Sequence, residues 1–382
     1  MPHTTAFYDW KARIDTRFDT LRPHHRAALA EYSFAMLFAR CCGLTSVTKY
    51  LAAFLAVNAH TLRQRLRELY QPAAAQIGPA RSEFDHTHCF APLVRWAAAN
   101  HPTKQLVLAL DPTQLTDRFR ILCVAVLYRG CGLPVAWAVT AADQNGSWNA
   151  IWFDLLGKLR VALGDGWTVL VLTDRGLESA ALFREIVRLG WHPMMRVKAG
   201  GKFQPTGWRS GHGMSHFAQK IGNRWSGGGV AYPTGDRLSC TLLASWDDGH
   251  TEPWLILTDL PATGANAAWY AWRMGIEQGF RAIKRGCWPW HRTQMRDPGR
   301  VARLWAVIAV ATLYAVEVGS EGQPAELPKI PPAFSPLKEG LLRIAMALLR
   351  HELLPTGNIE HHAWPDCHEP SDPLAEPYVH KG

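Results

Sequence analysis

The sequence predicts a mixed α/β protein that begins with a helical domain. Two observations lead to this fold class. Residues 1–100 carry alanine- and leucine-rich helical patterns without a convincing strand, whereas short runs of strand-forming residues alternate with helical stretches from Gln105 onward. With 382 residues, of which 48% are hydrophobic, the chain is long enough for two or three domains and a sizeable core.

The predicted N-terminal domain, residues 1–100, consists of helices. Helical patterns cover His25–Ala39, Thr45–Leu55 and Thr61–Tyr70. Only the turn Ala56–His60 separates the last two, and the final helix carries Arg63, Arg65 and Arg67. This arrangement resembles a helix-turn-helix that enters a DNA groove. Two helices of an ordinary bundle with a solvated basic face would give the same pattern.

The first part of the predicted core, residues 101–198, contains five strands. Three runs come first, Gln105–Asp111, Arg120–Tyr128 and Leu133–Thr140, with a hairpin turn at Gly130–Gly132. The chain then alternates through helix Trp148–Leu163, strand Trp167–Thr173, helix Leu177–Leu189 and strand Trp191–Val197. This order predicts a mixed sheet of ribonuclease H type flanked by helices, in which the fourth strand lies beside the first. Asp111 and Asp174, which end those two strands, should then be neighbours.

The rest of the chain is predicted to contain an insertion, the second part of the core and a tail. Residues 199–252 are rich in Gly, Ser and Trp and predict a β-rich insertion, with Leu238–Ser245 as the best strand. Residues 253–320 resume the core. They are predicted to form strand Trp254–Thr258, a helix that bears Glu277, and helix Pro298–Val318, which would cover the sheet. Residues 321–382 predict a Pro-rich linker (Gln323–Pro336), a helix (Pro336–Leu354) and a flexible tail.

Charge and composition favour an anionic partner and exclude a membrane-spanning protein. Lys and Arg outnumber acids 41 to 32, which gives a net charge of +9. Nucleic acid is one candidate partner for such a chain, although many basic proteins bind none. The longest apolar run, Leu304–Val316, is too short to span a bilayer. Eight scattered cysteines without a C-x2-C pair indicate a reducing compartment. We therefore expect a cytoplasmic protein.

The most informative segment, Tyr270–Lys284, holds an acid among cations. Its tyrosine, arginine, glutamate and lysine have the spacing Y-x2-R-x3-E-x6-K. On one helix, residues three or four positions apart share a face, so a single stripe would hold Arg273, Glu277, Arg281 and Lys284. A metal-binding carboxylate beside phosphate-binding cations is suited to cleavage of a phosphodiester.

Two upstream aspartates complete this chemistry. Phosphodiester cleavage is commonly catalysed by two divalent ions about 3.5–4 Å apart, and Mg²⁺ prefers hard oxygen ligands. Asp111, on a central strand, is the natural bridging ligand, and Asp174 and Glu277 would each complete one site. The alternative is structural. Asp174 would then cap the following helix, and Glu277 would belong to a solvated face with i,i+4 ion pairs.

Taken together, these residues resemble the cut-and-paste DDE transposases of bacterial insertion sequences, the group with the Y-x2-R-x3-E-x6-K signature. The resemblance covers roughly residues 105–320. It rests on the signature, on Leu110–Leu115 and on Leu172–Gly176. It implies a ribonuclease H-like core that a β-rich insertion interrupts between the second aspartate and the glutamate. It also assigns Asp111, Asp174 and Glu277 as ligands of two Mg²⁺ ions, for which Mn²⁺ would substitute.

The resemblance further assigns DNA contacts. Tyr270, Arg273 and Lys284 would contact phosphates at the transposon end, and Arg281 is an additional candidate. Trp254, which opens the strand before the signature, has the place of a tryptophan that stacks on a flipped base in some members. The loop from Thr258 to Tyr270 is short, which leaves less room for base flipping.

The implied function is that of a transposase. It would bind terminal inverted repeats, pair two ends as a homodimer on double-stranded DNA, and cleave and join strands with Mg²⁺ in a bacterial, nucleoid-associated setting. Three alternatives stay open: a ribonuclease H-like nuclease without strand transfer, a transposase-derived DNA-binding protein without turnover, and a basic scaffold for protein partners.

Overall fold

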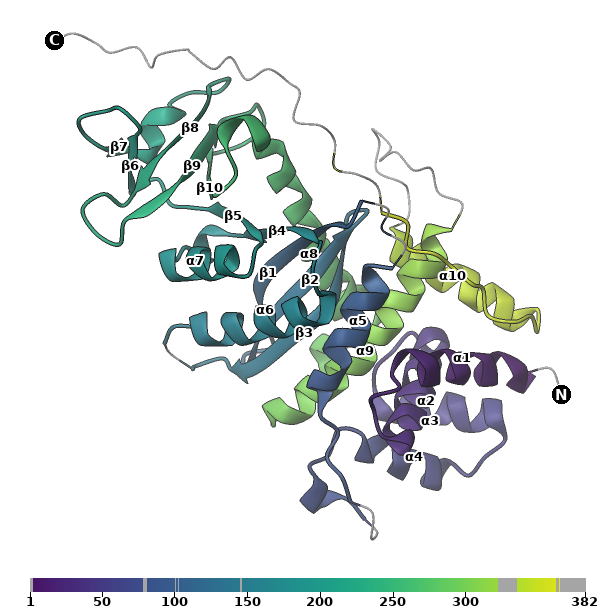
Figure 1. Ribbon diagram of the computed structural model, residues 1–382. Coiled ribbons are helices and arrows are strands. Elements are labelled where there is room, and N and C mark those ends of the chain that lie inside the picture. Colours follow the sequence, from purple (N-terminus) through teal and green to yellow (C-terminus); the bar gives the residue numbers. More distant parts are fainter. Residues whose placement is uncertain are drawn as a thin grey trace. The chain divides into compact units, whose positions relative to one another are not determined.

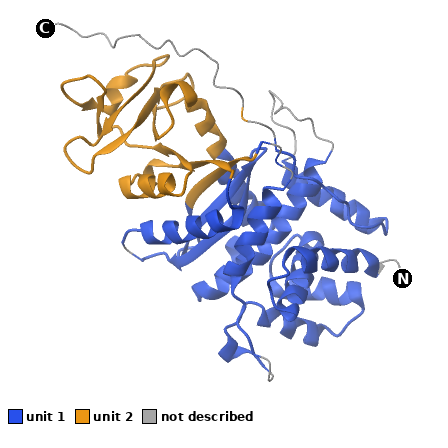
Figure 2. Ribbon diagram, viewed as in Figure 1, with its two compact units in different colours: residues 1–103, 112–165, 274–362 blue, residues 104–111, 166–273, 363–382 orange. Residues whose placement is uncertain are grey.

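The computed structural model describes residues 3–77, 81–99, 101, 103–144, 146–321, 335–361 and 364. The chain divides into two compact units, each assembled from three segments (Figure 2). Unit 1 comprises residues 1–103, 112–165 and 274–362, and unit 2 comprises residues 104–111, 166–273 and 363–382.

Unit 2 is built on a mixed sheet (Figure 1). Its strands lie in the order β1-β4-β5-β10-β9-β8-β6-β7. The parallel part consists of β1 (Gln105–Leu115, of which residues up to Asp111 belong to this unit), β4 (Thr168–Thr173) and β5 (His192–Arg196). Helix α7 (Ala180–Arg188) makes the crossover between β4 and β5 and packs on β5. Val169–Thr173 are all buried, as expected for a central parallel strand covered on both faces.

The predicted pairing of the first and fourth strands is confirmed. β1 and β4 are parallel, with Leu110 opposite Thr173. The predicted end of the first strand is wrong, because β1 continues past Asp111 to Leu115. The apolar run does stop at Asp111, but Pro112 follows it, and a residue before proline is biased towards extended conformations.

The region predicted to be β-rich, residues 199–252, does contain strands. It contains β6 (Lys202–Pro205), β7 (His212–Gly213), β8 (Arg224–Ala231) and β9 (Leu238–Ser245). These strands continue the sheet of unit 2, because β9 pairs antiparallel with β10 (Trp254–Thr258), and β10 pairs antiparallel with β5. An aromatic cluster of Phe203, Phe217 and Trp225 supports the insertion.

Unit 1 surrounds one buried helix, α9 (Pro298–Ser320), whose residues Val301–Ser320 are all buried. It packs against β3, α2 and α10. Within the described residues, α9 alone is long and apolar enough by itself to cross a membrane, and its burial is that of the core helix of a folded protein. The other helices of this unit are α1 (His3–Arg17), α2 (Pro23–Ala39), α3 (Leu44–Leu55), α4 (Ala59–Glu68), α5 (Phe90–Ala97), α6 (Asn149–Leu163), α8 (Met274–Arg281) and α10 (Pro336–Leu349).

Unit 1 also contains a β-hairpin of β2 (Phe119–Tyr128) and β3 (Cys131–Ala141). Its turn is Arg129-Gly130, one residue earlier than predicted, because both residues have positive φ, 45° and 74°, as a two-residue type I′ turn requires. Helix α9 packs on β3, in agreement with the prediction that it covers the sheet. The predicted linker lies largely outside the described residues, and α10 ends at Leu349, five residues earlier than predicted.

The predicted helix pair of the N-terminal region is present as α3 and α4. Ala56 ends α3 in the left-handed region, and the Asn58 side chain caps α4 by accepting from the amides of His60 and Thr61. Helices α1 and α5 were not among the predicted helices of this region. Arg65 of α4 donates two hydrogen bonds, of 2.6 and 2.7 Å, to Glu31.

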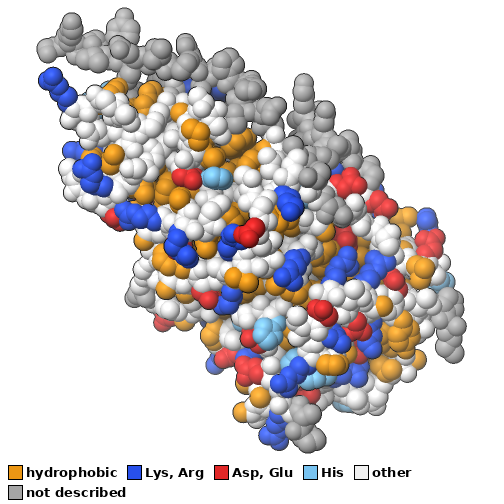
Figure 3. Space-filling model, viewed as in Figure 1, with side chains coloured by type: hydrophobic (Ala, Val, Ile, Leu, Met, Phe, Trp, Pro, Cys, Tyr) orange, Lys and Arg blue, Asp and Glu red, His pale blue; other side chains and the backbone are white. Residues whose placement is uncertain are grey.

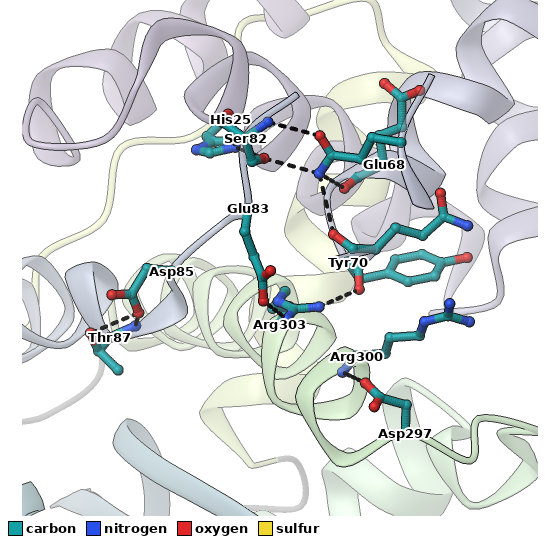
Figure 4. A network of polar contacts seen from close by, with 12 residues as sticks. His25, Glu68, Tyr70, Ser82, Glu83, Asp85, Thr87, Asp297, Arg300 and Arg303 are labelled. Carbon is teal, nitrogen blue, oxygen red and sulfur yellow. Dashed lines mark hydrogen bonds and ion pairs between the residues drawn. The ribbon is translucent and has the colours of Figure 1, made fainter. Parts of the chain in front are cut away.

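Arg303 ties the segment after α4 to the buried helix α9 (Figure 4). Its guanidinium is buried and donates to the Tyr70 carbonyl oxygen at 2.9 Å and to the Glu83 carboxylate. In the same segment the Gln76 amide donates to the Ser82 carbonyl and accepts from the Ser82 amide. A single cation thus satisfies two acceptors that belong to an otherwise irregular stretch of chain.

Replacing Arg303 with alanine should lower the free energy of unfolding by about 2–3 kcal/mol, because the Tyr70 carbonyl and the Glu83 carboxylate lose a charged donor. Arg300→Ala, three residues earlier on α9, is the matched control and should change it by no more than about 0.5 kcal/mol. Urea unfolding followed by tryptophan fluorescence measures both. Equal losses in the two variants would contradict the role of Arg303.

Candidate active site

Asp111 and Asp174 lie together in unit 2, at one edge of its sheet. Asp111 lies on β1 and Asp174 directly follows β4, and the two strands run parallel, so both residues reach the edge at which parallel strands carry their carboxyl ends. The Asp174 carboxylate also accepts from the Gly176 amide at 2.8 Å, which fixes its orientation. The pairing of the strands therefore positions both acids.

Arg273 joins the two carboxylates. Its Nη2 atom lies 2.6 Å from Oδ1 of Asp111 and 3.4 Å from Oδ2 of Asp174. The arginine side chain is 9% exposed, whereas the aspartates are 15% and 35% exposed. Two carboxylates directed at one point repel each other unless a cation lies between them. The edge of the sheet is therefore built to hold positive charge between these two acids.

Tyr270 and Trp254 pack beside the end of β4. The buried Tyr270 donates its hydroxyl to the Thr173 carbonyl oxygen at 3.2 Å, one residue before Asp174. The half-buried Trp254 packs edge-on against the Tyr270 ring, with centroids 5.3 Å apart. Both side chains thereby restrain the end of β4. Their predicted contacts with DNA stay predictions.

The predicted single helix over Tyr270–Lys284 is wrong. The segment is a 3₁₀ helix over Ala267–Arg273, the α-helix α8 over Met274–Arg281, and a π-helical turn over Ala282–Cys287. Since these types differ in residues per turn, the four residues do not form one continuous stripe, although Glu277 and Arg281 share a face of α8. Arg273 is buried in the 3₁₀ part, whereas Glu277 and Arg281 are exposed on α8. The prediction of one stripe assumed a constant helical period over Tyr270–Lys284.

Glu277 belongs to unit 1, where two glycines seat its helix on the β2–β3 hairpin. A Cβ atom at Gly279 would lie 2.9 Å from the amide nitrogen and carbonyl oxygen of Gly132. A Cβ atom at Gly275 would lie 3.2 Å from the Gly130 carbonyl carbon. The backbones of α8 and the hairpin therefore meet with no room for side chains between them. The approach of Glu277 to the two aspartates stays a prediction.

Lys284, also in unit 1, is held by the segment that follows Asp111. Its ammonium donates to Thr113 Oγ1 at 2.7 Å and to the Gln114 carbonyl at 3.0 Å. The π-helical turn that carries Lys284 lies in the class of helix distortions often found at functional sites. These two bonds anchor the Lys284 side chain. Its predicted phosphate contact stays a prediction.

The acids are chemically suitable ligands for a hard divalent ion. Carboxylate oxygens are what Mg²⁺ prefers, and a cationic group already lies between the two aspartates. Over the described residues, no group of three or more His, Cys, Asp or Glu side chains is gathered closely enough to hold a metal ion. The structure thus brings two of the three predicted ligands together.

Two features of this region escaped the sequence analysis. The first is the role of Arg273 as the counter-charge of the aspartates, which has no local signal because Asp111 is 162 residues away. The second is the glycine contact beneath α8. Its signal was present, since Gly275 and Gly279 are four residues apart and share one helix face.

Comparison with known proteins gives a family. The family model described as "Transposase DDE domain" matches residues 105–314. No curated protein matches the chain. Among solved structures, a cryo-EM structure of a piggyBac transposase synaptic complex with hairpin DNA is similar at 10% sequence identity, with a TM-score of 0.43, over 91% of this chain and 79% of that chain. A likeness at this level establishes neither a shared fold nor a shared activity.

Gly279→Ala should destabilise the protein by about 1–3 kcal/mol, because the new methyl group would overlap the Gly132 backbone and force α8 off the hairpin. Gly157→Ala is the control. Gly157 is a helical glycine of α6 with nothing within 4 Å of the added Cβ, and its replacement should stabilise by about 0.5–1 kcal/mol. Thermal and urea unfolding measure both changes. A neutral Gly279→Ala variant would contradict the close seating of α8.

Arg273→Gln should lower the free energy of unfolding by about 2 kcal/mol, since it removes the counter-charge from two carboxylates that are only partly solvated. Mg²⁺ should then raise the unfolding temperature of this variant more than that of the unaltered protein, because a ligand that binds the folded state stabilises it. Differential scanning calorimetry, with and without Mg²⁺, measures both effects.

The exposed Arg281, replaced by glutamine in the same way, is the matched control for Arg273. It should change stability by no more than about 0.5 kcal/mol and should not alter the response to Mg²⁺. If the two variants behave alike, Arg273 does not neutralise the aspartate pair.

Proposed function

The chain belongs to the transposase DDE domain family, and on that premise we propose that it cleaves DNA at the ends of a mobile element and joins the freed strands to a target. The observation that carries this proposal is the pair Asp111 and Asp174, held on neighbouring parallel strands around one guanidinium. A transposase of this family needs acidic residues that share cations, and this pair already shares one.

The proposed ligands of two Mg²⁺ ions, or of Mn²⁺ in their place, are Asp111, Asp174 and Glu277. Bound there, the ions would activate the attacking oxygen and stabilise the leaving oxygen of the phosphodiester. The fit rests on the donor set, which consists of hard oxygens, and on the guanidinium of Arg273, which stands where a cation is required. Glu277 is four positions after Arg273, so the covalent chain alone keeps their Cα atoms within about 14 Å.

The side chains around the acids have distinct proposed roles. Arg273 neutralises the carboxylates of the free protein and turns to a DNA phosphate when metal ions take its place. Tyr270 restrains the end of β4 through the Thr173 carbonyl. Lys284 and Arg281 add positive charge for the DNA backbone, and Trp254 offers an aromatic face to a displaced base.

We propose that the N-terminal helices α3 and α4 recognise the DNA ends. The side chains of Arg63, Arg65 and Arg67 are exposed on α4, and Arg65 is already paired with Glu31. Figure 3 shows Lys and Arg side chains interspersed with acidic and apolar ones on the face it draws. Net charge alone therefore does not define a DNA surface, and the recognition role rests on the helix-turn-helix arrangement.

Pairing of two transposon ends requires two active sites, so the proposed working form is a homodimer on double-stranded DNA. Hydrolysis at each end would free a 3′-OH, and that hydroxyl would then attack the target strand. Such a protein would act at the nucleoid of a bacterial cytoplasm.

Asp111→Asn, Asp174→Asn and Glu277→Gln should each reduce strand cleavage by at least about a hundredfold, the scale of losing one group that stabilises charge in the transition state. DNA binding should be largely retained, because each change removes negative charge without altering side-chain size. Cleavage is measured on a plasmid that carries the gene with its flanking DNA, in the presence of Mg²⁺, and binding is measured by gel shift.

Asp165→Asn is the matched control, since Asp165 is an acid with a 95% exposed side chain and undergoes the same chemical change. It should cleave normally. Retained cleavage in any of the three variants would remove that residue from the metal site. Cleavage without joining of pre-cut ends would favour the nuclease, and binding without any cleavage by the unaltered protein would favour the non-catalytic alternative.

A further inference from the structure

A cavity opens in unit 2 beside the aspartate pair. Its volume is about 390 Å³, within the range of pockets that hold small ligands. Polar and aromatic side chains line it, among them Arg175, Arg196, Gln219, Trp246 and Glu252. Arg175 is the residue after Asp174, so the cavity begins one residue from the candidate active site.

Strand directions place the cavity and the aspartates along the same sheet edge. β4 and β5 run parallel, and their last residues lead into Asp174 and Arg196. β10 runs antiparallel to β5, so its first residue, Trp254, lies at that edge directly after Glu252 and Pro253. β9 runs antiparallel to β10 and ends there, just before Trp246.

Two arginines in the cavity share one carboxylate. Arg175 Nη1 lies 2.6 Å from one oxygen of Glu252, and Arg196 Nη2 lies 2.9 Å from the other. The trio therefore carries a net positive charge. Arg196 is 19% exposed, whereas Arg175 and Glu252 are 51% and 42% exposed. The more buried Arg196 is therefore held in place, whereas the Glu252 carboxylate is accessible to solvent.

The geometry resembles that of a phosphate held by two guanidiniums. A phosphodiester has two non-bridging oxygens, as a carboxylate has two oxygens, and arginine forms bidentate contacts with either group. An exposed ion pair contributes little to stability, so pairing two arginines with one surface acid adds little to the stability of the fold. Beside a site that cuts DNA, the same arginines would meet a neighbouring phosphate of the strand.

We propose that this cavity binds a backbone phosphate of DNA together with its sugar, and that the Glu252 carboxylate occupies the phosphate position until DNA displaces it. The inference rests on the proposed function and adds to it a second, non-catalytic contact with the DNA strand. Arg175 and Arg196 are the phosphate ligands, and Trp246 forms an apolar wall of the cavity.

The test measures binding of a fluorescent DNA duplex to the full chain without divalent ions, so that no strand is cut. Glu252→Gln frees both arginines and should tighten binding about fivefold, the scale of one exposed ion pair. Arg196→Gln should weaken binding and reduce the slope of log K against log salt by about 0.9, the contribution of one phosphate, between about 50 and 200 mM salt. Adding Arg196→Gln to Glu252→Gln should abolish the gain.

Asp236→Asn is the matched control. Asp236 pairs with Arg184 on the surface of the same unit, outside the cavity, so this change also removes one acid and frees one arginine. Tighter binding with Glu252→Gln but not with Asp236→Asn supports the phosphate site. Equal gains in both variants would show that net charge alone causes the tighter binding, and this would overturn the phosphate site. Unchanged binding in Glu252→Gln would also overturn it.

These results separate the two proposals. If the pocket variants leave binding unchanged while the unaltered protein still cleaves DNA with Mg²⁺, only the phosphate site is overturned. If the unaltered protein neither binds nor cleaves DNA, both proposals are overturned. Circular dichroism and thermal unfolding of each variant establish that it is folded, and the gain of affinity in Glu252→Gln is a change that misfolding does not produce.

Discussion

The candidate site depends on the contact of the Arg273 guanidinium with the carboxylates of Asp111 and Asp174. This guanidinium lies within hydrogen-bonding or ion-pairing distance of two carboxylates on neighbouring parallel strands. Without a cation at this point, the pairing of β1 with β4 would force two negative charges together in a partly desolvated place. The strand register, the buried arginine and the tyrosine that holds the end of β4 therefore form one arrangement, in which each part needs the others.

This arrangement has a consequence for the free protein. Two neighbouring carboxylates repel each other when no cation lies between them, and in this chain the side chain of Arg273 supplies that cation. Glu252 presents the inverse case in the neighbouring cavity, where an acid is shared by two arginines. In both places the chain supplies, from its own residues, a charge opposite to that of the groups around it.

Local sequence patterns were sufficient to predict the buried parallel strands. Buried parallel strands appear as continuous apolar runs, so Val169–Thr173 and Leu106–Leu110 were recognisable, and the order of elements implied that β1 and β4 pair. Local patterns were not sufficient for the segment Tyr270–Lys284, where tertiary contacts override the helical period. The helix over Tyr270–Lys284 changes type twice, since Tyr270 and Arg273 are buried in unit 2 while the two glycines of α8 fit the hairpin of unit 1. The spacing of residues in the sequence does not show where the helix changes type.

The boundary between the compact units passes through the signature itself, between Arg273 and Met274, and also between Asp111 and Pro112. Two of the three predicted functional blocks are therefore divided, whereas Leu172–Gly176 lies wholly in unit 2. Asp111 belongs to unit 2, whereas the next residues, Pro112–Leu115, belong to unit 1 and receive Lys284. Thr113 and Gln114, which hold Lys284 within unit 1, are therefore only two and three positions after Asp111 of unit 2.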